Sequence, residues 1–311
     1  MTEKLAVETQ DLTKKYDGTT VVDRLNLHIK ENEIFGLLGP NGAGKTTTIL
    51  MLLGLTEPAS GSARVYGFNP TREPLQVKRL IGYLPEKVGF YDNLTAVENL
   101  NFIAELNSIS FAEIPSRVDE VLSMVGLGDR KTMAVGKFSR GMKQRLGLAD
   151  VLIKRPKIIF LDEPTSGLDP EGINQLLDLI ANLPKTGTTV VLSSHQLYQV
   201  QRVCHNIGIL SKGKMVIEGS IDKLGREALA GGRYRIEVET VKPTPKLIDA
   251  VKKIKGVLTV DRQENILLIS TDADLRAEIS KAVVQNNFPL IQMKIQEFSL
   301  DEVYMRYFRE S

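Results

Sequence analysis

The sequence has little of three features, and each shortage excludes a class of protein. It has one cysteine in 311 residues, Cys204, which rules out an internal disulfide or a cysteine-rich metal site and favours a reducing cytosol. No run approaches about 20 apolar residues, so no membrane-spanning helix is expected, and residues 1–6 lack the apolar core of a signal peptide. The net charge is only +2, from 40 Lys and Arg against 38 Asp and Glu, so nucleic acid is not expected as the main partner.

Residues 39–47, GPNGAGKTT, fit the phosphate-binding pattern G-x-x-x-x-G-K-[ST]. Glycines let the backbone curl so that successive N–H groups face one centre, which a triphosphate can fill. An apolar run precedes the loop and a helical pattern follows it, so the loop lies at a helix N-terminus, where the dipole favours anions. The predicted ATP contacts are Gly39, Pro40, Asn41, Gly42, Ala43, Gly44, Lys45, Thr46 and Thr47. Lys45 is expected to reach the β- and γ-phosphates, and the Thr46 hydroxyl to bind Mg²⁺.

A second apolar run, residues 158–161, delivers two carboxylates to the end of a predicted buried strand. Active-site crevices of parallel α/β sheets lie at such strand ends. Asp162 fits the second Mg²⁺-associated group, and Glu163 fits the residue that polarises the attacking water. Another apolar strand, residues 188–194, ends at His195, which is placed to donate a hydrogen bond to developing phosphate charge.

Ser139 and Gly141 precede a helical pattern and form a second potential anion site. Taken alone, Ser139 is better explained as an ordinary N-cap. Tyr16 is expected in a polar turn over residues 14–18, either as a surface tyrosine or as a stacking platform for a nucleobase.

The order of elements predicts two domains. An α-helical subdomain, about residues 87–150, is inserted into a nucleotide-binding core that spans residues 1–224, and Thr95 with Glu98 predicts a capping box at its first helix. A glycine-containing linker follows at 225–232. Residues 233–311 read as β-α-β-β-α-β, which is typical of a ferredoxin-like unit, and Ser299 with Glu302 predicts a final capped helix.

Taken together and in order, these motifs over residues 5–222 resemble the ATPase subunit of an ABC transporter. Tyr16 matches the adenine-stacking aromatic, residues 39–47 match Walker A, and residues 158–163 match Walker B with its catalytic glutamate. Residues 138–142 match the signature, usually LSGGQ, and His195 matches the switch histidine. The D-loop matches Ser166, Gly167, Leu168 and Asp169.

The resemblance implies an α/β fold: a P-loop NTPase core of ABC type, with an antiparallel β subdomain and the inserted α-helical subdomain. The small C-terminal α+β domain resembles that of the drug, sodium, polysaccharide and copper-related exporter branch. Two motifs depart from the family pattern. Glu86 replaces the Q-loop glutamine, where its carboxylate can still serve Mg²⁺. In the signature, Met142 replaces the glutamine and Arg140 replaces the first glycine, either adding a cation near the phosphate or pointing to solvent.

The resemblance also implies a function. Two subunits dimerise head to tail, and each ATP lies between the Walker A loop of one and Ser139 and Gly141 of the other. The Mg²⁺ is expected to lie on Thr46 and, through water, on Asp162, with Glu86 nearby. Hydrolysis is expected to depend on Lys45, Glu163 and His195. The homodimer is expected at the cytoplasmic face of the cell membrane, peripheral to separate permease subunits, and export is the expected direction.

Two alternatives belong to other classes. A soluble ABC ATPase acting on nucleic acid or ribosomes is disfavoured, because residues 47–138 hold no heptad run and the chain has one cassette. A non-catalytic nucleotide-binding module is disfavoured by the intact Lys45, Glu163 and His195.

Overall fold

The computed structural model describes residues 4–221, 223–224, 234–241 and 243–295. The chain divides into two compact units, Met1–Gly219 and Ser220–Ser311. The predicted linker at 225–232 and the predicted final helix with Ser299 and Glu302 lie outside the described residues. No described helix is both long enough and apolar enough to cross a membrane.

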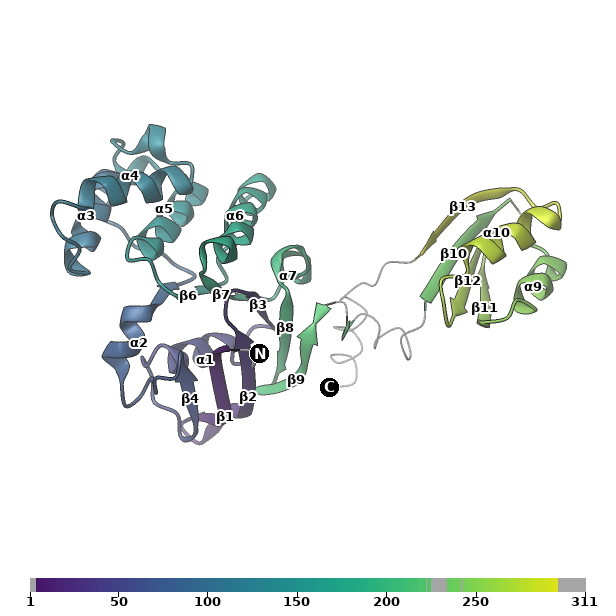
Figure 1. Ribbon diagram of the computed structural model, residues 1–311, viewed down its shortest axis with the longest axis horizontal. Helices are drawn as coiled ribbons and strands as arrows, with labels where there is room; N and C mark the ends of the chain where they lie inside the picture. Colours follow the sequence, from purple (N-terminus) through teal and green to yellow (C-terminus); the bar gives the residue numbers. More distant parts are fainter. Residues whose placement is uncertain (1–3, 222, 225–233, 242, 296–311) are drawn as a thin grey trace. The chain divides into compact units, whose positions relative to one another are not determined.

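The first unit is organised on a six-stranded sheet with the order β5-β6-β7-β3-β8-β9 (Figure 1). Its pairs β5–β6, β6–β7, β7–β3 and β3–β8 are parallel, so the carboxyl ends of these strands meet at one edge. β3, β6 and β7 are buried throughout, as expected of strands covered on both faces. The bounds are β3 Ile34–Leu38, β5 Ile81–Leu84, β6 Ile158–Asp162, β7 Thr189–Ser194, β8 Asn206–Ser211 and β9 Lys214–Ser220.

An antiparallel sheet of order β2-β1-β4 confirms the predicted β subdomain. Its strands are β1 Leu5–Tyr16, β2 Thr19–Lys30 and β4 Ser60–Val65. Buried side chains of this sheet, of helix α1 (Lys45–Leu52) and of β3 form one core. The predicted turn over residues 14–18 is wrong, because the strand continues to Tyr16 and only Asp17 and Gly18 turn. Both have positive φ, 47° and 79°, as a two-residue hairpin with a type I′ turn requires.

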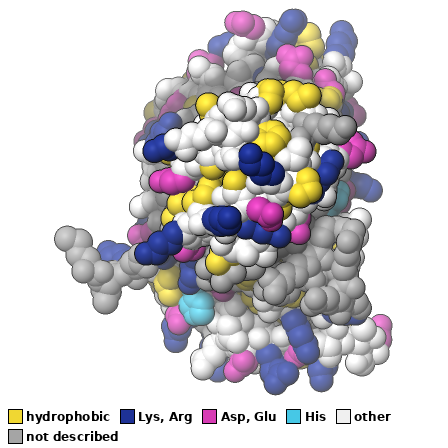
Figure 2. Space-filling view, turned by 90° about the vertical axis from the view of Figure 1, so that its right-hand side faces the viewer, with side chains coloured by type: hydrophobic (Ala, Val, Ile, Leu, Met, Phe, Trp, Pro, Cys, Tyr) yellow, Lys and Arg dark blue, Asp and Glu magenta, His cyan; other side chains and the backbone are white. Residues whose placement is uncertain are grey.

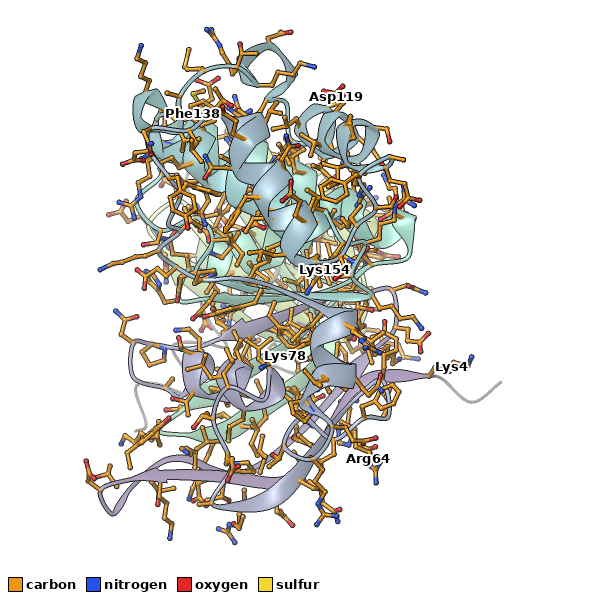
Figure 3. All side chains as sticks on the ribbon, turned by 90° about the vertical axis from the view of Figure 1, so that its left-hand side faces the viewer. Lys4, Arg64, Lys78, Asp119, Phe138 and Lys154 are labelled. Atoms are coloured by element: carbon orange, nitrogen blue, oxygen red, sulfur yellow. The ribbon has the colours of Figure 1, made fainter. Side chains whose placement is uncertain are left out.

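The helical subdomain consists of α3 (Ala96–Leu106), α4 (Ile114–Met124) and α5 (Arg140–Leu152), with short 3₁₀ turns at Gly128–Arg130 and Val135–Lys137. The predicted capping box is confirmed: the Thr95 hydroxyl accepts from Glu98 N, and the Glu98 carboxylate accepts from Thr95 N. Just beyond α5, Lys154 Nζ donates to the Lys78 carbonyl, 3.0 Å away, at the end of α2 (Pro74–Leu80); Figure 3 labels both residues. This bond ties the base of the helical subdomain to the core.

Three further elements complete the first unit: α6 (Pro170–Asn182), a 3₁₀ turn at Leu183–Thr186 and α7 (Leu197–Val203). α6 begins at an N-cap Asp169, whose carboxylate accepts from Gly172 N, and Pro170 occupies the first helical position. The helix therefore starts two residues earlier than the apolar pattern alone predicts.

The second unit has its own core and the predicted β-α-β-β-α-β order of elements. Its sheet has the order β11-β12-β10-β13, with every neighbouring pair antiparallel. Alternate residues of the strands and one face of each helix meet in the core, as their spacing predicts. The bounds are β10 Tyr234–Thr240, α9 Pro245–Lys252, β11 Val257–Gln263, β12 Ile266–Thr271, α10 Arg276–Gln285 and β13 Leu290–Ile295.

Candidate nucleotide site

The phosphate loop connects β3 to α1 at the carboxyl edge of the parallel sheet. Gly44, the N-cap of α1, has φ 101°, and a Cβ there would lie 2.8 Å from the carbonyl oxygen of Val21. No side chain caps the helix, and its first turn holds no acidic residue. The loop therefore offers uncapped N–H groups at a helix N-terminus, which is the chemistry an anionic phosphate requires.

Lys45 is 6% exposed, yet its ammonium is fully engaged. Nζ donates to the carbonyl oxygens of Gly39 and Pro40, at 2.7 and 3.2 Å, and lies 3.2 Å from Oε1 of Glu163. These contacts hold the side chain back over its own loop. A buried cation so placed sits beside whatever the loop binds.

Asp162 is 3% exposed and is held by two hydroxyls. Thr46 donates to its Oδ2 at 2.8 Å, and Ser193 donates to its Oδ1 at 2.5 Å. Asp162 and Ser193 are paired in the β6–β7 register, so sheet packing sets this contact. Ser193 is a site residue that the sequence motifs do not predict, although its place at a strand end two residues before His195 is a signal that could have identified it.

The donor chemistry around Asp162 fits Mg²⁺. A hydroxyl and a carboxylate are the hard oxygen ligands that this ion takes in small number, with water and phosphate completing its shell. In the described ranges, no three His, Cys, Asp or Glu side chains cluster to hold a metal by themselves. Burial, and secondarily the charge of Asp162, raises the pKa of Tyr83 to about 12, so this phenol stays protonated beside the carboxylate.

Glu163 follows β6 with φ 47°, a left-handed conformation that non-glycine residues rarely adopt. Its N–H donates to the hydroxyl and carbonyl oxygens of Ser193, which fixes the turn. Oε1 accepts no hydrogen bond from the described residues, although the Lys45 ammonium lies nearby. Strain of this kind often accompanies a functional position, and no pattern in the sequence predicts it.

His195 pairs with the same carboxylate. Its Nδ1 lies 2.9 Å from Oε2 of Glu163, and 43% of its side chain is exposed. The carboxylate only accepts, so Nδ1 carries the proton, and in the neutral imidazole Nε2 is then an acceptor. His195 can therefore donate to a phosphate oxygen only as the imidazolium or after leaving Glu163.

Glu86 follows β5 at the same sheet edge and accepts a hydrogen bond from the Ser166 hydroxyl, 3.2 Å away. The structure thus brings the phosphate loop, Asp162, Glu163 and His195 into one connected set, and links Glu86 to the D-loop.

Ser139 and Gly141 belong to a different surface. Ser139 is the N-cap of α5, and its hydroxyl accepts from Met142 N at 3.2 Å, so the capping interpretation is confirmed. Both residues line a hollow of about 340 Å³, together with Gly167, Leu168 and Asp169. In the described part of the chain, no hydrogen bond or ion pair joins them to the phosphate loop.

Tyr16 is 44% exposed at the end of β1, and the Lys14 ammonium lies 4.8 Å from its ring centroid. Its ring is available for stacking, with a cation already against the aromatic system.

Comparisons with known proteins agree with this geometry. A family model described as ABC transporter matches residues 22–166. A bacitracin transport ATP-binding protein of Bacillus licheniformis is 36% identical over 96% of this chain and 96% of its own length. A daunorubicin/doxorubicin resistance ATP-binding protein of Streptomyces peucetius is 33% identical over 96% of this chain and 91% of its own.

A solved structure, described as the dimeric post-hydrolysis state of the ATP-binding cassette MJ0796 bound to ADP and Pi, is 26% identical to this chain. It aligns with a TM-score of 0.63 and covers 69% of this chain and 98% of that one. The phosphate loop, the strand-end carboxylates and near full-length relatives above 30% identity lead to one conclusion. The chain belongs to the ATP-binding subunits of ABC transporters and is an ABC-type ATPase that hydrolyses ATP.

Proposed function

We propose that this chain powers an exporter, working as a homodimer at the cytoplasmic face of the cell membrane, peripheral to separate permease subunits. The observation that carries the proposal is the connected set of Lys45, Asp162, Glu163 and His195 at the phosphate loop. The names of the relatives, bacitracin transport and daunorubicin/doxorubicin resistance, support an antibiotic-like cargo and the outward direction.

Glu163 is held between two cationic or proton-donating groups that a γ-phosphate would also attract. Lys45 lies 3.2 Å from one of its oxygens and His195 lies 2.9 Å from the other. When ATP enters, Lys45 and His195 turn to its phosphates. Glu163 then loses both partners and is free to accept a proton from the attacking water. The carboxylate is thus inactive as a base until the substrate is in place.

Thr46 and Asp162 would hold Mg²⁺, with Glu86 nearby. When bound, the ion would neutralise phosphate charge. The Thr46 hydroxyl could offer an oxygen lone pair to the ion while its O–H still donates to Asp162, and Ser193 keeps the carboxylate oriented. The uncapped N–H groups of the loop bind the phosphates, and Tyr16 stacks on the adenine.

The position of the exposed Ser139 and the half-buried Gly141 at the N-terminus of α5 supports the dimer. A helix N-terminus that has no anionic partner in the described part of its own chain is suited to an ATP held by a second copy, and the MJ0796 cassette is a dimer. Gly167, Leu168 and Asp169 of the D-loop line the same hollow and would lie at that interface. A monomer is then expected to bind ATP but to hydrolyse it poorly.

The net charge of +2 gives no support to nucleic acid as the main partner. On the face of the molecule shown in Figure 2, Lys and Arg side chains are intermixed with Asp and Glu side chains. A nucleic-acid site requires a basic patch or stripe.

The partner is tested by trapping the complex. The full chain carrying Glu163→Gln is expressed in its native host with an affinity tag, and membranes are solubilised in detergent with MgATP. We expect capture of an integral membrane protein with about six apolar segments. The matched control is Lys45→Ala, which should leave the dimer open. Capture of ribosomes or nucleic acid instead of a membrane protein would overturn the transport assignment.

A further inference from the structure

Two of the residues that depart from the family pattern, Arg140 and Glu86, contact the same short turn. This 163–168 turn runs from Glu163 to Leu168 and is closed by two backbone hydrogen bonds, Ser166 N to Glu163 O at 3.0 Å and Leu168 N to Thr165 O at 3.2 Å. It carries the proposed catalytic carboxylate at its first residue.

Arg140 covers one side of the turn. A Cβ built on Gly167 would fall directly on the Arg140 guanidinium, so the planar group lies against the Gly167 backbone, which has φ 68°. In the described part of the chain, this guanidinium makes no hydrogen bond or ion pair, and its contact with the turn is one of packing. A planar, weakly hydrated guanidinium is suited to such stacking, whereas a lysine ammonium is not.

Glu86 holds the other side. Its Oε1 accepts the hydrogen bond from Ser166, the residue next to Gly167, at 3.2 Å. Arg140 is the first residue of α5, the signature helix, and Glu86 follows β5 beside the nucleotide edge. The turn therefore has one neighbour on the signature side and one on the nucleotide side of the same subunit.

We propose that Arg140 is a positioning residue for hydrolysis, which packs the 163–168 turn against the signature helix so that movement of this helix reaches Glu163 and Glu86. The inference rests on the proposed roles of these two carboxylates. Arg140 does not touch the reacting atoms; it acts through Gly167 and the Ser166–Glu86 bond. A Cβ at Gly167 would displace the guanidinium from this contact, so the absence of a side chain there is what lets Arg140 lie against the turn.

A double-mutant cycle on the full-length protein tests the coupling. Arg140→Ala, Ser166→Ala and the double variant are assayed for steady-state hydrolysis over a range of MgATP concentrations. Each single change is expected to lower kcat about fivefold and leave KM within twofold. Since both release the same turn, the double variant is expected to lose about fivefold as well, not the 25-fold product. Arg140→Lys should have a kcat as low as that of Arg140→Ala, because lysine keeps the positive charge but lacks the planar guanidinium that packs on Gly167.

Lys143→Ala is the matched control. Lys143 lies in the first turn of the same helix but pairs with Asp92, 2.8 Å away. Its effect should combine with Ser166→Ala as a simple product. Independent effects of Arg140→Ala and Ser166→Ala, or full activity of Arg140→Ala or Arg140→Lys, would overturn the proposal. Lys45→Ala separates this outcome from failure of the proposed function, because undiminished hydrolysis in that variant would refute the site itself.

Discussion

The helices α1 and α5 both have an N-terminus predicted to bind an anion, but the two N-termini differ in their capping and in the side chains around them. At α1 the N-cap is Gly44, no side chain occupies the first N–H groups, and the buried Lys45 stands beside them. At α5 the N-cap is Ser139, whose hydroxyl accepts a hydrogen bond from the N–H of Met142. Ser139 lines an open hollow on the surface. The same helical dipole is thus combined with the proposed catalytic groups at α1 and with none of them at α5.

This difference indicates which of the two helix N-termini, that of α1 or that of α5, can bind a nucleotide by itself. α1 has the cation, the metal-type oxygens and the carboxylate within one connected network, so it can bind a nucleotide without help. α5 offers a capped end with the small residues Ser139 and Gly141, which in the proposed dimer would complete a site formed elsewhere. We infer two unequal halves of one dimeric site.

The largest expected effect is on α1. Lys45→Ala removes a buried ammonium that faces the phosphates, and ATP affinity should fall about 100-fold, the loss typical of a charge-assisted contact. Binding of a fluorescent ATP analogue measures it, with Lys143→Ala on α5 as the matched control at near wild-type affinity. An unchanged ATP affinity in Lys45→Ala would contradict the proposal that the N-terminus of α1, and not that of α5, binds the nucleotide.

Glu163→Gln separates binding from chemistry at the complete half. The amide cannot accept the proton of the attacking water, so kcat should fall about 1,000-fold while ATP binding is retained. With hydrolysis blocked, MgATP should drive the chain to a dimer, which light scattering after size exclusion detects. Hydrolysis at the parent rate would refute the role of Glu163, and a monomer in MgATP would contradict the shared site.

Ser139→Ala tests the incomplete half. The change removes an N-cap that contributes about 1 kcal/mol to helix stability and a hydroxyl facing the proposed partner site. ATP affinity of the monomer should stay within twofold, while the protein concentration needed for half-maximal hydrolysis should rise about tenfold. A large loss of monomer affinity would instead show that α5 contributes to binding in its own chain.

The smallest effect concerns α5 alone. Burial, partly offset by Lys154, raises the pKa of Asp150 to about 6, above the value of 3.8 expected in the unfolded chain. The folded state therefore holds a proton that the unfolded state has lost between about pH 4 and 6, and stability falls as the pH rises through that window.

Asp150→Asn removes this penalty. Its Tm should exceed that of the parent by about 2–4 °C at pH 8, and by less at pH 4.5, where the parent carboxyl is protonated. Differential scanning calorimetry at the two pH values measures it, with the exposed Asp129→Asn as control. An equal shift at both values would mean that the amide acts through packing and not through charge.

Much of the fold followed from the sequence, because its signals are local. Apolar runs over residues 34–38 and 158–161 became buried parallel strands, the Thr95 capping box formed, and the β-α-β-β-α-β order appeared in the second unit. Tyr16 was misplaced because backbone pairing with Thr19 extended the strand past a polar segment. Element boundaries of this kind depend on the neighbouring strand, which a one-dimensional pattern does not contain.

The amino-acid sequence by itself determined the phosphate loop: glycine spacing, the lysine and the adjoining strand and helix are a contiguous property of about nine residues. Tertiary structure alone decided how the loop is used. Thr46 meets Asp162 across 116 positions, Ser166 meets Glu86 across 80, and Glu163 is shared by Lys45 and His195. These contacts depend on strand register and helix packing, since hydrogen bonds require atoms to within a few tenths of an ångström and no local pattern specifies that.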